Sequence, residues 1–70
     1  MAEFETGLPS VRHIQRIIQE GKDVELKLLT QDLVIGKLTW QDQNCICITT
    51  PDDQSMIIWR NAIAYLKPQP

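Results

Sequence analysis

The sequence predicts a small, mainly β domain in which one N-terminal α-helix precedes a strongly bent antiparallel barrel of five strands. Three observations lead to this fold class. Apolar residues recur every three to four positions over residues 8–20, and afterwards the period falls to two in short runs separated by turn residues. A length of 70 residues allows one domain, and 43% hydrophobic with 23% charged residues is typical of a folded chain.

The helix is predicted to begin at Leu8, after a loose arm at residues 1–7. Its apolar stripe consists of Leu8, Val11, Ile14, Ile17 and Ile18. Pro9 suits the first turn because its missing N–H would have no partner there. Gly21 suits the C-terminal end, so the helix is expected to have about three turns.

The five strands are predicted from the apolar runs at residues 24–29, 33–42, 45–50, 55–60 and 63–67. Turn-forming residues separate most of these runs, and Pro68 ends the last one. Gly36 lies in the middle of the second strand and predicts a bend or bulge there. One domain is therefore expected over residues 8–68, with residues 69–70 as a tail.

The fourth predicted strand contains the run Met56-Ile57-Ile58-Trp59, which is apolar on both faces. In a monomer such a strand would expose hydrophobic surface along an open edge, and pairing with another copy would cover it. A core of this size also leaves only a few kcal/mol of stability, which association would increase. An oligomer is therefore expected, and a monomeric adaptor barrel is disfavoured.

Composition and motifs argue against catalysis and against several binding classes. No Gly-rich phosphate loop, Ser-His-Asp set or metal-ligand cluster is present, so no enzyme activity, cofactor or metal is expected. Asp52 and Asp53 follow a proline in a turn, where aspartate is favoured for bonding to its own backbone. A net charge of −2 with a pI near 5.1 argues against a general nucleic-acid coat.

The chain is expected to be cytoplasmic and not to insert into a membrane. Its first residues lack a basic segment followed by an apolar one, and no run reaches the ~18 apolar residues of a membrane span.

Several residues allow both a structural and a functional interpretation. Cys45 and Cys47 are interpreted as core thiols rather than redox or metal groups, and His13 as a surface histidine. For Trp40 and Trp59, packing is favoured over a role as nucleobase platforms, with Trp59 placed at the subunit boundary.

Segments spread along the chain match one known family in order and spacing. They are Leu8-Pro9-Ser10-Val11, Val24-Glu25-Leu26-Lys27-Leu28-Leu29-Thr30, Ile35-Gly36, Asp42-Gln43 and Ala62-Ile63. Together they resemble bacterial Hfq, the Sm-like RNA chaperone, and most of all its cyanobacterial branch. The resemblance implies an Sm-like fold and a homohexameric ring in which the fourth strand of each subunit pairs with the fifth strand of its neighbour. The expected interface residues are Met56, Ile58, Trp59 and Tyr65.

The resemblance also implies a pore-side pocket for single-stranded, uridine-rich RNA, formed here by Gln43, Asn44, Arg60 and Asn61. Asn44 stands where the family has an aromatic residue, Arg60 where it has a lysine, and Asn61 where it has a histidine. Stacking on an aromatic ring contributes ~1–3 kcal/mol per base, so weak binding is expected. Arg60 allows a functional and an ordinary surface role about equally.

For adenine-rich RNA the family uses the opposite face, where this chain has Lys27, Gln31 and Asp32. The family places a tyrosine, a glycine and an apolar residue at these positions. Lys27 offers no ring for stacking, and it is interpreted first as an ordinary solvent-facing residue of its strand. Asp32 adds a charge that repels phosphate, so this face is expected to bind RNA poorly.

Two functions remain open from the sequence. The first is an RNA-binding post-transcriptional regulator with weakened RNA sites, which the retained Gln43 and Arg60 favour. The second is a ring-shaped platform for protein interactions with little RNA binding, which the acidic pI and the missing aromatic residue favour. For this platform, resemblance to the cyanobacterial branch implies a type IV pilus ATPase as partner and an effect on motility.

Overall fold

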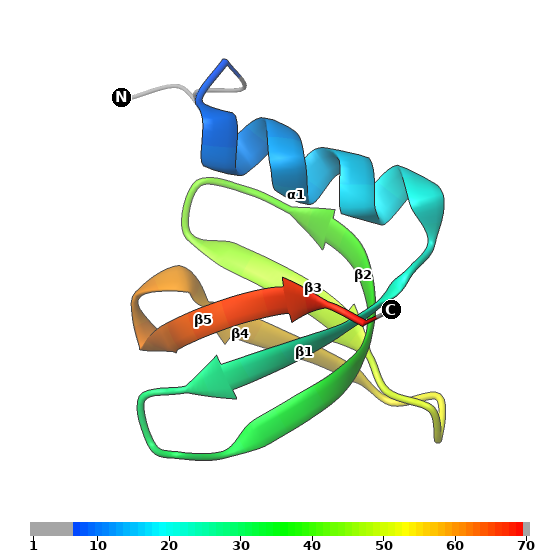
Figure 1. The fold of residues 1–70 in the computed structure, drawn as a ribbon. Helices are drawn as coiled ribbons and strands as arrows, with labels where there is room; N and C mark the ends of the chain where they lie inside the picture. Colours follow the sequence, from blue (N-terminus) through cyan, green and yellow to red (C-terminus); the bar gives the residue numbers. More distant parts are fainter. Residues whose placement is uncertain (1–6, 70) are drawn as a thin grey trace.

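Helix α1 (Pro9–Glu20) precedes five strands and one short 3-10 helix in the computed structural model (Figure 1), which describes residues 7–69. The elements after the helix are β1 (Asp23–Leu28), β2 (Leu33–Gln41), β3 (Cys45–Thr49), β4 (Ser55–Trp59), η1 (Arg60–Ala62) and β5 (Ile63–Pro68). The predicted fold class is therefore confirmed. Residues 1–6 of the predicted arm and residue 70 of the predicted tail lie outside the described residues.

The strands form one antiparallel sheet in the order β4-β3-β2-β1-β5. The sheet bends strongly, as Figure 1 shows, but β4 and β5 do not pair with each other, so the expected barrel stays open. The two strands that come last in the sequence are therefore the two edges of the sheet.

The bend of β2 depends on Gly36. A Cβ atom at this residue would lie 2.3 Å from the carbonyl oxygen of Thr49, so β3 approaches too closely for any side chain. The register shift of β2 lies further along, between Leu38 and Trp40, and not at the glycine. This shift explains why Trp40 is 41% exposed, although simple alternation places it with the buried Leu38.

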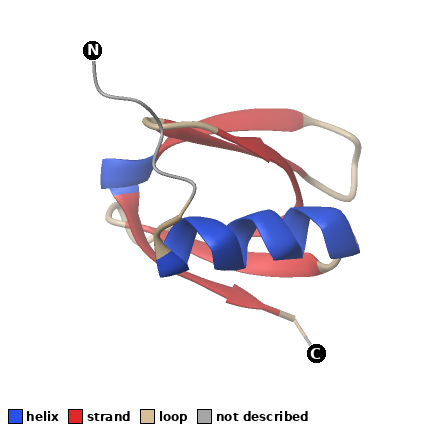
Figure 2. Ribbon diagram, turned by 90° about the horizontal axis from the view of Figure 1, so that it is seen from above, coloured by secondary structure: helices blue, strands red, loops and turns tan. Residues whose placement is uncertain are grey.

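The core fills the inside of the bent sheet and is closed at one end by α1, which lies across that end in Figure 2. Its buried members are Ile17, Val24, Leu26, Val34, Leu38, Ile46, Ile48 and Ile58. Cys45 and Cys47 are also buried and free, which confirms their interpretation as core thiols. Burial, together with the charge of Asp42, raises the pKa of the Cys45 thiol, so this thiol is a poor nucleophile.

Helix α1 begins and ends where its sequence predicts. Pro9 occupies its first turn, and Gly21 ends it in the left-handed conformation, with φ 66°. The N–H of Gly21 donates to the carbonyl oxygens of Ile17 (3.1 Å) and Ile18 (3.2 Å), which satisfies two groups that the helix leaves open. Over residues 7–69, no helix combines the length and the apolar character needed to cross a membrane.

Candidate functional site

Two loops meet at one end of the sheet, and together they carry the four residues of the expected pore-side pocket. The first is the β2–β3 turn with Gln43 and Asn44, and the second is η1 with Arg60 and Asn61. The backbone N–H of Arg60 donates to the Asn44 carbonyl oxygen over 2.8 Å, which holds the loops together. Figure 1 shows the β2–β3 turn beside α1. The structure thus brings together two pairs of neighbouring residues that are separated by 16 to 18 positions along the chain.

Asp42 shapes the β2–β3 turn. Its Oδ1 atom accepts the backbone N–H groups of Asn44 (2.9 Å) and Cys45 (2.8 Å). These two bonds, with the nearby positive charge of Arg60, lower the pKa of the Asp42 carboxyl below its ordinary value. The carboxylate is therefore charged at neutral pH, and the turn that presents Gln43 and Asn44 is closed by its own aspartate.

The Arg60 side chain is half-buried and lies against the end of β2. Its Nε donates to the carbonyl oxygen of Asp42 over 2.9 Å, and its Nη2 donates to Oε1 of Gln41 over 2.6 Å. Two bonds from one guanidinium fix both its position and the plane of the group. The positive charge of Arg60 is therefore held in a fixed position at this end of the sheet.

Gln41 belongs to this arrangement, although sequence reasoning did not select it. Its Nε2 donates to the Val11 carbonyl oxygen and to Oε1 of Gln15, both over 3.1 Å. Gln41 thus joins Arg60 to helix α1. A glutamine at the end of a strand carries no periodic or motif signal, and its partners lie 19, 26 and 30 residues away in the chain.

The chemistry of this site is that of hydrogen bonding and charge. A guanidinium and three neighbouring amides can pair with the edge of a base or with a phosphate oxygen. Among the described residues, no three His, Cys, Asp or Glu side chains gather closely enough to hold a metal ion. Asn44 offers no ring on which a base could stack.

The second predicted group consists of Lys27 in β1 and of Gln31 and Asp32 in the β1–β2 turn. Figure 1 shows this turn on the side of the sheet away from α1. Lys27 lies in β1 opposite Leu33 of β2 and Tyr65 of β5. Gln31 adopts φ 78°, a conformation that favours glycine. Asp32 accepts a hydrogen bond from the Thr30 hydroxyl over 2.7 Å.

Apolar side chains border this second group, a feature that sequence reasoning did not select. Leu29, Leu33 and Ile35 are 62%, 56% and 45% exposed. Leu33 and Ile35 lie on the same face of β2, as the alternating pattern predicts. The pattern does not show that this face is exposed to solvent.

The expected interface residues divide between two environments. Met56 and Trp59 of β4 and Tyr65 of β5 are exposed on the edge strands. Ile58 is 7% exposed, so its side chain belongs to the core of its own chain, and its expected place at the interface stays a prediction. Alternation along β4 explains this, because Ile58 points inward and Ile57, which is 55% exposed, points outward.

Tyr65 also takes part in a polar group on the outer face of β1 and β5. Its hydroxyl donates to Oε2 of Glu25 over 2.8 Å, and Lys67 Nζ lies 3.6 Å from the same oxygen. The hydrogen bond from Tyr65 is the main cause that lowers the pKa of Glu25, and it raises the pKa of Tyr65.

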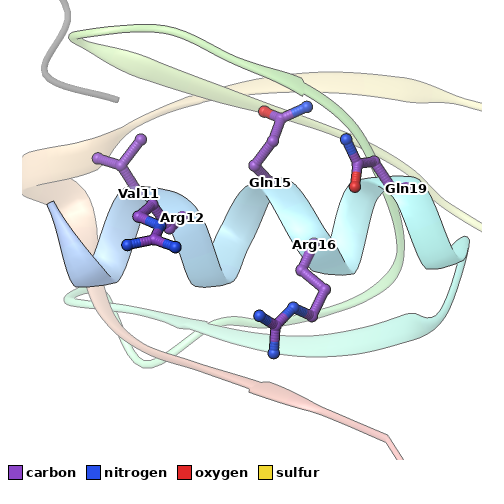
Figure 3. A pocket seen from close by; sticks show the side chains of 5 residues that line it. All are labelled: Val11, Arg12, Gln15, Arg16 and Gln19. Carbon is purple, nitrogen blue, oxygen red and sulfur yellow. The ribbon is translucent and has the colours of Figure 1, made fainter. Parts of the chain in front are cut away.

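Helix α1 carries a further polar surface. Val11, Arg12, Gln15, Arg16 and Gln19 line a shallow groove of about 310 Å³ along it. In Figure 3, Gln15 and Gln19 lie on one side of the helix and Arg16 on the other. Because Gln15 contacts Gln41, this groove adjoins the network around Arg60.

Comparison with known proteins identifies the family. A family model described as "Hfq related" matches residues 8–68. The crystal structure of an Hfq protein from Anabaena sp. matches with a TM-score of 0.82 and 44% identity, over 90% of this chain and 100% of that chain. The crystal structure of the pleiotropic translational regulator Hfq matches with a TM-score of 0.78 over 83% of this chain and 95% of that chain. Its identity is 12%, so it shows the fold alone.

No curated protein sequence matches the chain. The family model spans nearly all of the chain that carries the helix and the sheet, and the Anabaena protein agrees with it at a level of identity that goes beyond a shared fold. The resemblance expected from the sequence, including that to the cyanobacterial branch, is thereby confirmed. This chain belongs to the Hfq-related family.

Proposed function

We propose that the chain forms a cytoplasmic homohexameric ring that binds the uridine-rich ends of single-stranded RNA weakly and regulates transcripts after transcription. The placement of Arg60 carries this proposal, because two hydrogen bonds hold its guanidinium against Gln41 and Asp42, next to the turn that carries Gln43 and Asn44. The ring acts by binding and not by catalysis. Membership of the Hfq-related family supports a role in regulation through RNA binding.

The two edges of the sheet support a ring. β4 and β5 each have one side without a partner strand within the described chain, and β4 exposes Ile57 and Trp59 there. Pairing β4 of one copy with β5 of the next satisfies backbone groups and covers apolar surface together. A contact between two different edges is heterologous, and such contacts close into rings when the rotation per subunit divides evenly.

Weak RNA binding follows from the composition of the site. Gln43, Asn44, Arg60 and Asn61 provide hydrogen bonds and one positive charge per subunit, without an aromatic ring. Stacking, which contributes ~1–3 kcal/mol per base, is therefore missing at this position. The opposite face has Lys27 and Asp32 in place of a stacking surface, so adenine-rich RNA is expected to bind more weakly still.

Fluorescence anisotropy with short uridine-rich and adenine-rich RNAs over a salt series tests this function. We expect uridine-rich RNA to bind at low salt, to weaken steeply with added salt, and to lose at least tenfold in affinity on Arg60→Ala. Arg16→Ala is the matched control, because it removes the same charge from the helix surface. Tight adenine-rich binding that does not depend on Lys27, or an Arg60→Ala ring that binds like wild type, would contradict the proposal.

A second candidate function is a platform for protein interactions, and the exposed surface of α1 favours it. Arg12, His13 and Arg16 lie exposed on this helix in a chain with net charge −2. Over residues 7–69, neither arginine forms a salt bridge. A partner with an acidic segment would complement this surface, and resemblance points to a type IV pilus ATPase.

If neither RNA binds the ring at low salt, the function as a platform for protein interactions is favoured. Titration of the purified ring with the ATPase would then show binding that is lost in the double variant Arg12→Glu, Arg16→Glu and kept in Arg60→Ala. Binding that survives the double charge reversal would exclude this surface.

A further inference from the structure

Gln41 connects helix α1 with the short helix η1 through hydrogen bonds to both. It is half-buried at the end of β2, between helix α1 on one side and η1 on the other. On the helix side its Nε2 donates to the Val11 carbonyl oxygen and Gln15 Oε1, both over 3.1 Å. On the η1 side its Oε1 accepts from Arg60 Nη2 over 2.6 Å.

The chemistry of the partners leaves one orientation for the Gln41 amide. A backbone carbonyl can only accept a hydrogen bond, and a guanidinium can only donate one. The amide nitrogen must therefore face Val11, and the amide oxygen must face Arg60. Rotating the amide by 180° would place two acceptors together at Val11 and two donors together at Arg60, so the orientation is determined by both neighbours at once.

A fixed amide oxygen gives the Arg60 guanidinium its second anchor. The first anchor is the carbonyl oxygen of Asp42, 2.9 Å from Nε, in the turn that carries Gln43 and Asn44. The bond to the Asp42 carbonyl oxygen by itself allows the guanidinium to rotate about that bond. The second bond, to Gln41 Oε1, fixes the plane of the guanidinium. The position of the cation thus depends on a side chain that is itself held by the helix.

We propose that Gln41 is a positioning residue for Arg60, and that Gln15 of helix α1 supports this role by accepting a hydrogen bond from the Gln41 amide. The effect on RNA rests on the proposed function, whereas the effect on Arg60 itself does not. Gln15 Oε1 is one of the two acceptors that orient the amide nitrogen of Gln41, so helix α1 contributes to the position of Arg60.

The first experiment measures Arg60 directly in the assembled, ¹⁵N-labelled protein without RNA. We expect the Nε–H signal of Arg60, assigned by its loss in Arg60→Lys, to exchange slowly with water. Gln41→Met keeps the size of the side chain and removes both polar atoms, and it should speed this exchange at least threefold. Gln41→Glu loses the bonds to the helix but replaces the neutral acceptor for Arg60 with a carboxylate; the stronger charge-assisted bond offsets that loss and should preserve slow exchange. Gln54→Met, the same substitution in the exposed β3–β4 turn, is the control.

The second experiment tests the link to the helix with two glutamines that line the same groove. Gln15 forms a hydrogen bond with Gln41, whereas Gln19 lines the same groove and, within residues 7–69, forms no hydrogen bond with Gln41. Gln15→Leu should therefore speed the exchange of Arg60 Nε–H, and Gln19→Leu should leave it unchanged. Equal effects of the two substitutions would overturn the proposed link.

The third experiment is a double-mutant cycle on affinity for uridine-rich RNA. We expect Gln41→Met to weaken binding threefold to tenfold in the wild-type ring and to have no further effect in Arg60→Ala. The same loss in both backgrounds would show that Gln41 acts on the fold and not through Arg60. If the wild-type ring binds no RNA, the proposed function fails, while the exchange measurements still decide whether Gln41 positions Arg60. Unchanged exchange in Gln41→Met would overturn the positioning role whatever RNA does.

Discussion

At the scale of single residues, Gly36 determines how closely β2 can approach β3. A Cβ atom there would meet the oxygen and the carbon of the Thr49 carbonyl at 2.3 and 2.9 Å, and both belong to the backbone. We expect Gly36→Ala to destabilise the fold by about 3 kcal/mol, because the two strands must separate. Urea unfolding measures this loss. Gly7→Ala is the control, since a Cβ at Gly7 has nothing within 4 Å, and equal stability of the two variants would contradict the close approach.

Asp42 makes the stability of the chain depend on pH. Bonds from the backbone of Asn44 and Cys45, with the charge of Arg60, lower its pKa below the ordinary value of 3.8. Such a carboxylate stabilises the fold above its ordinary pKa, and the contribution is lost as pH falls through the lower pKa of the folded state. We therefore expect the wild type to lose stability below about pH 4, and Asp42→Asn to lose less over the same range. Unfolding midpoints at pH 3 and pH 7 measure this difference, with Asp53→Asn as a charge-matched control.

At the scale of elements, β4 serves two purposes because its side chains alternate. Ile58 belongs to the core, whereas Ile57 lies 55% exposed on the outer face of the same edge strand. Ile58→Asp places a charge in the core, and we expect it to unfold the chain, since the cost is comparable to the whole stability of so small a domain. Ile57→Asp should keep the circular dichroism of the wild type. A folded Ile58→Asp variant would show that this side chain is not needed in the core.

At the scale of the whole molecule, the two edge strands predict assembly. Native mass spectrometry should find six copies of the 8.1 kDa chain in one particle, because pairing of β4 with β5 leaves no edge unpaired in a closed ring. Ile57→Asp should shift the population to monomers, since it puts a charge beside the proposed joint. Ile35→Asp, on an exposed face away from β4, should leave the ring intact. A wild-type monomer at micromolar concentration would contradict the ring.

Much of the site could be predicted because it depends on short loops between periodic segments. Gln43 and Asn44 follow one strand and Arg60 and Asn61 another, and antiparallel pairing of β3 with β4 brings such loops to the same end of a sheet. Gln41 could not be predicted, because its role depends on Gln15 and Arg60, which lie 26 residues before and 19 residues after it. Local patterns carry no information about contacts at such separations.

The sequence by itself determined the order of elements, the ends of the helix and the family. These follow from local rules: the period of apolar residues, the fixed φ of Pro9, and the left-handed conformation that Gly21 adopts without strain. Only the tertiary structure decided which side of β4 is buried. Both of its faces are apolar, so alternation pairs Met56 with Ile58 and Ile57 with Trp59 without saying which pair faces the core. The strong bend of the sheet decides it, because it brings Ile58 into the core with Ile46 and Ile48 of β3. Ile57 and Trp59 on the other face, and Met56 at the start of the strand, stay exposed to water or to a second copy.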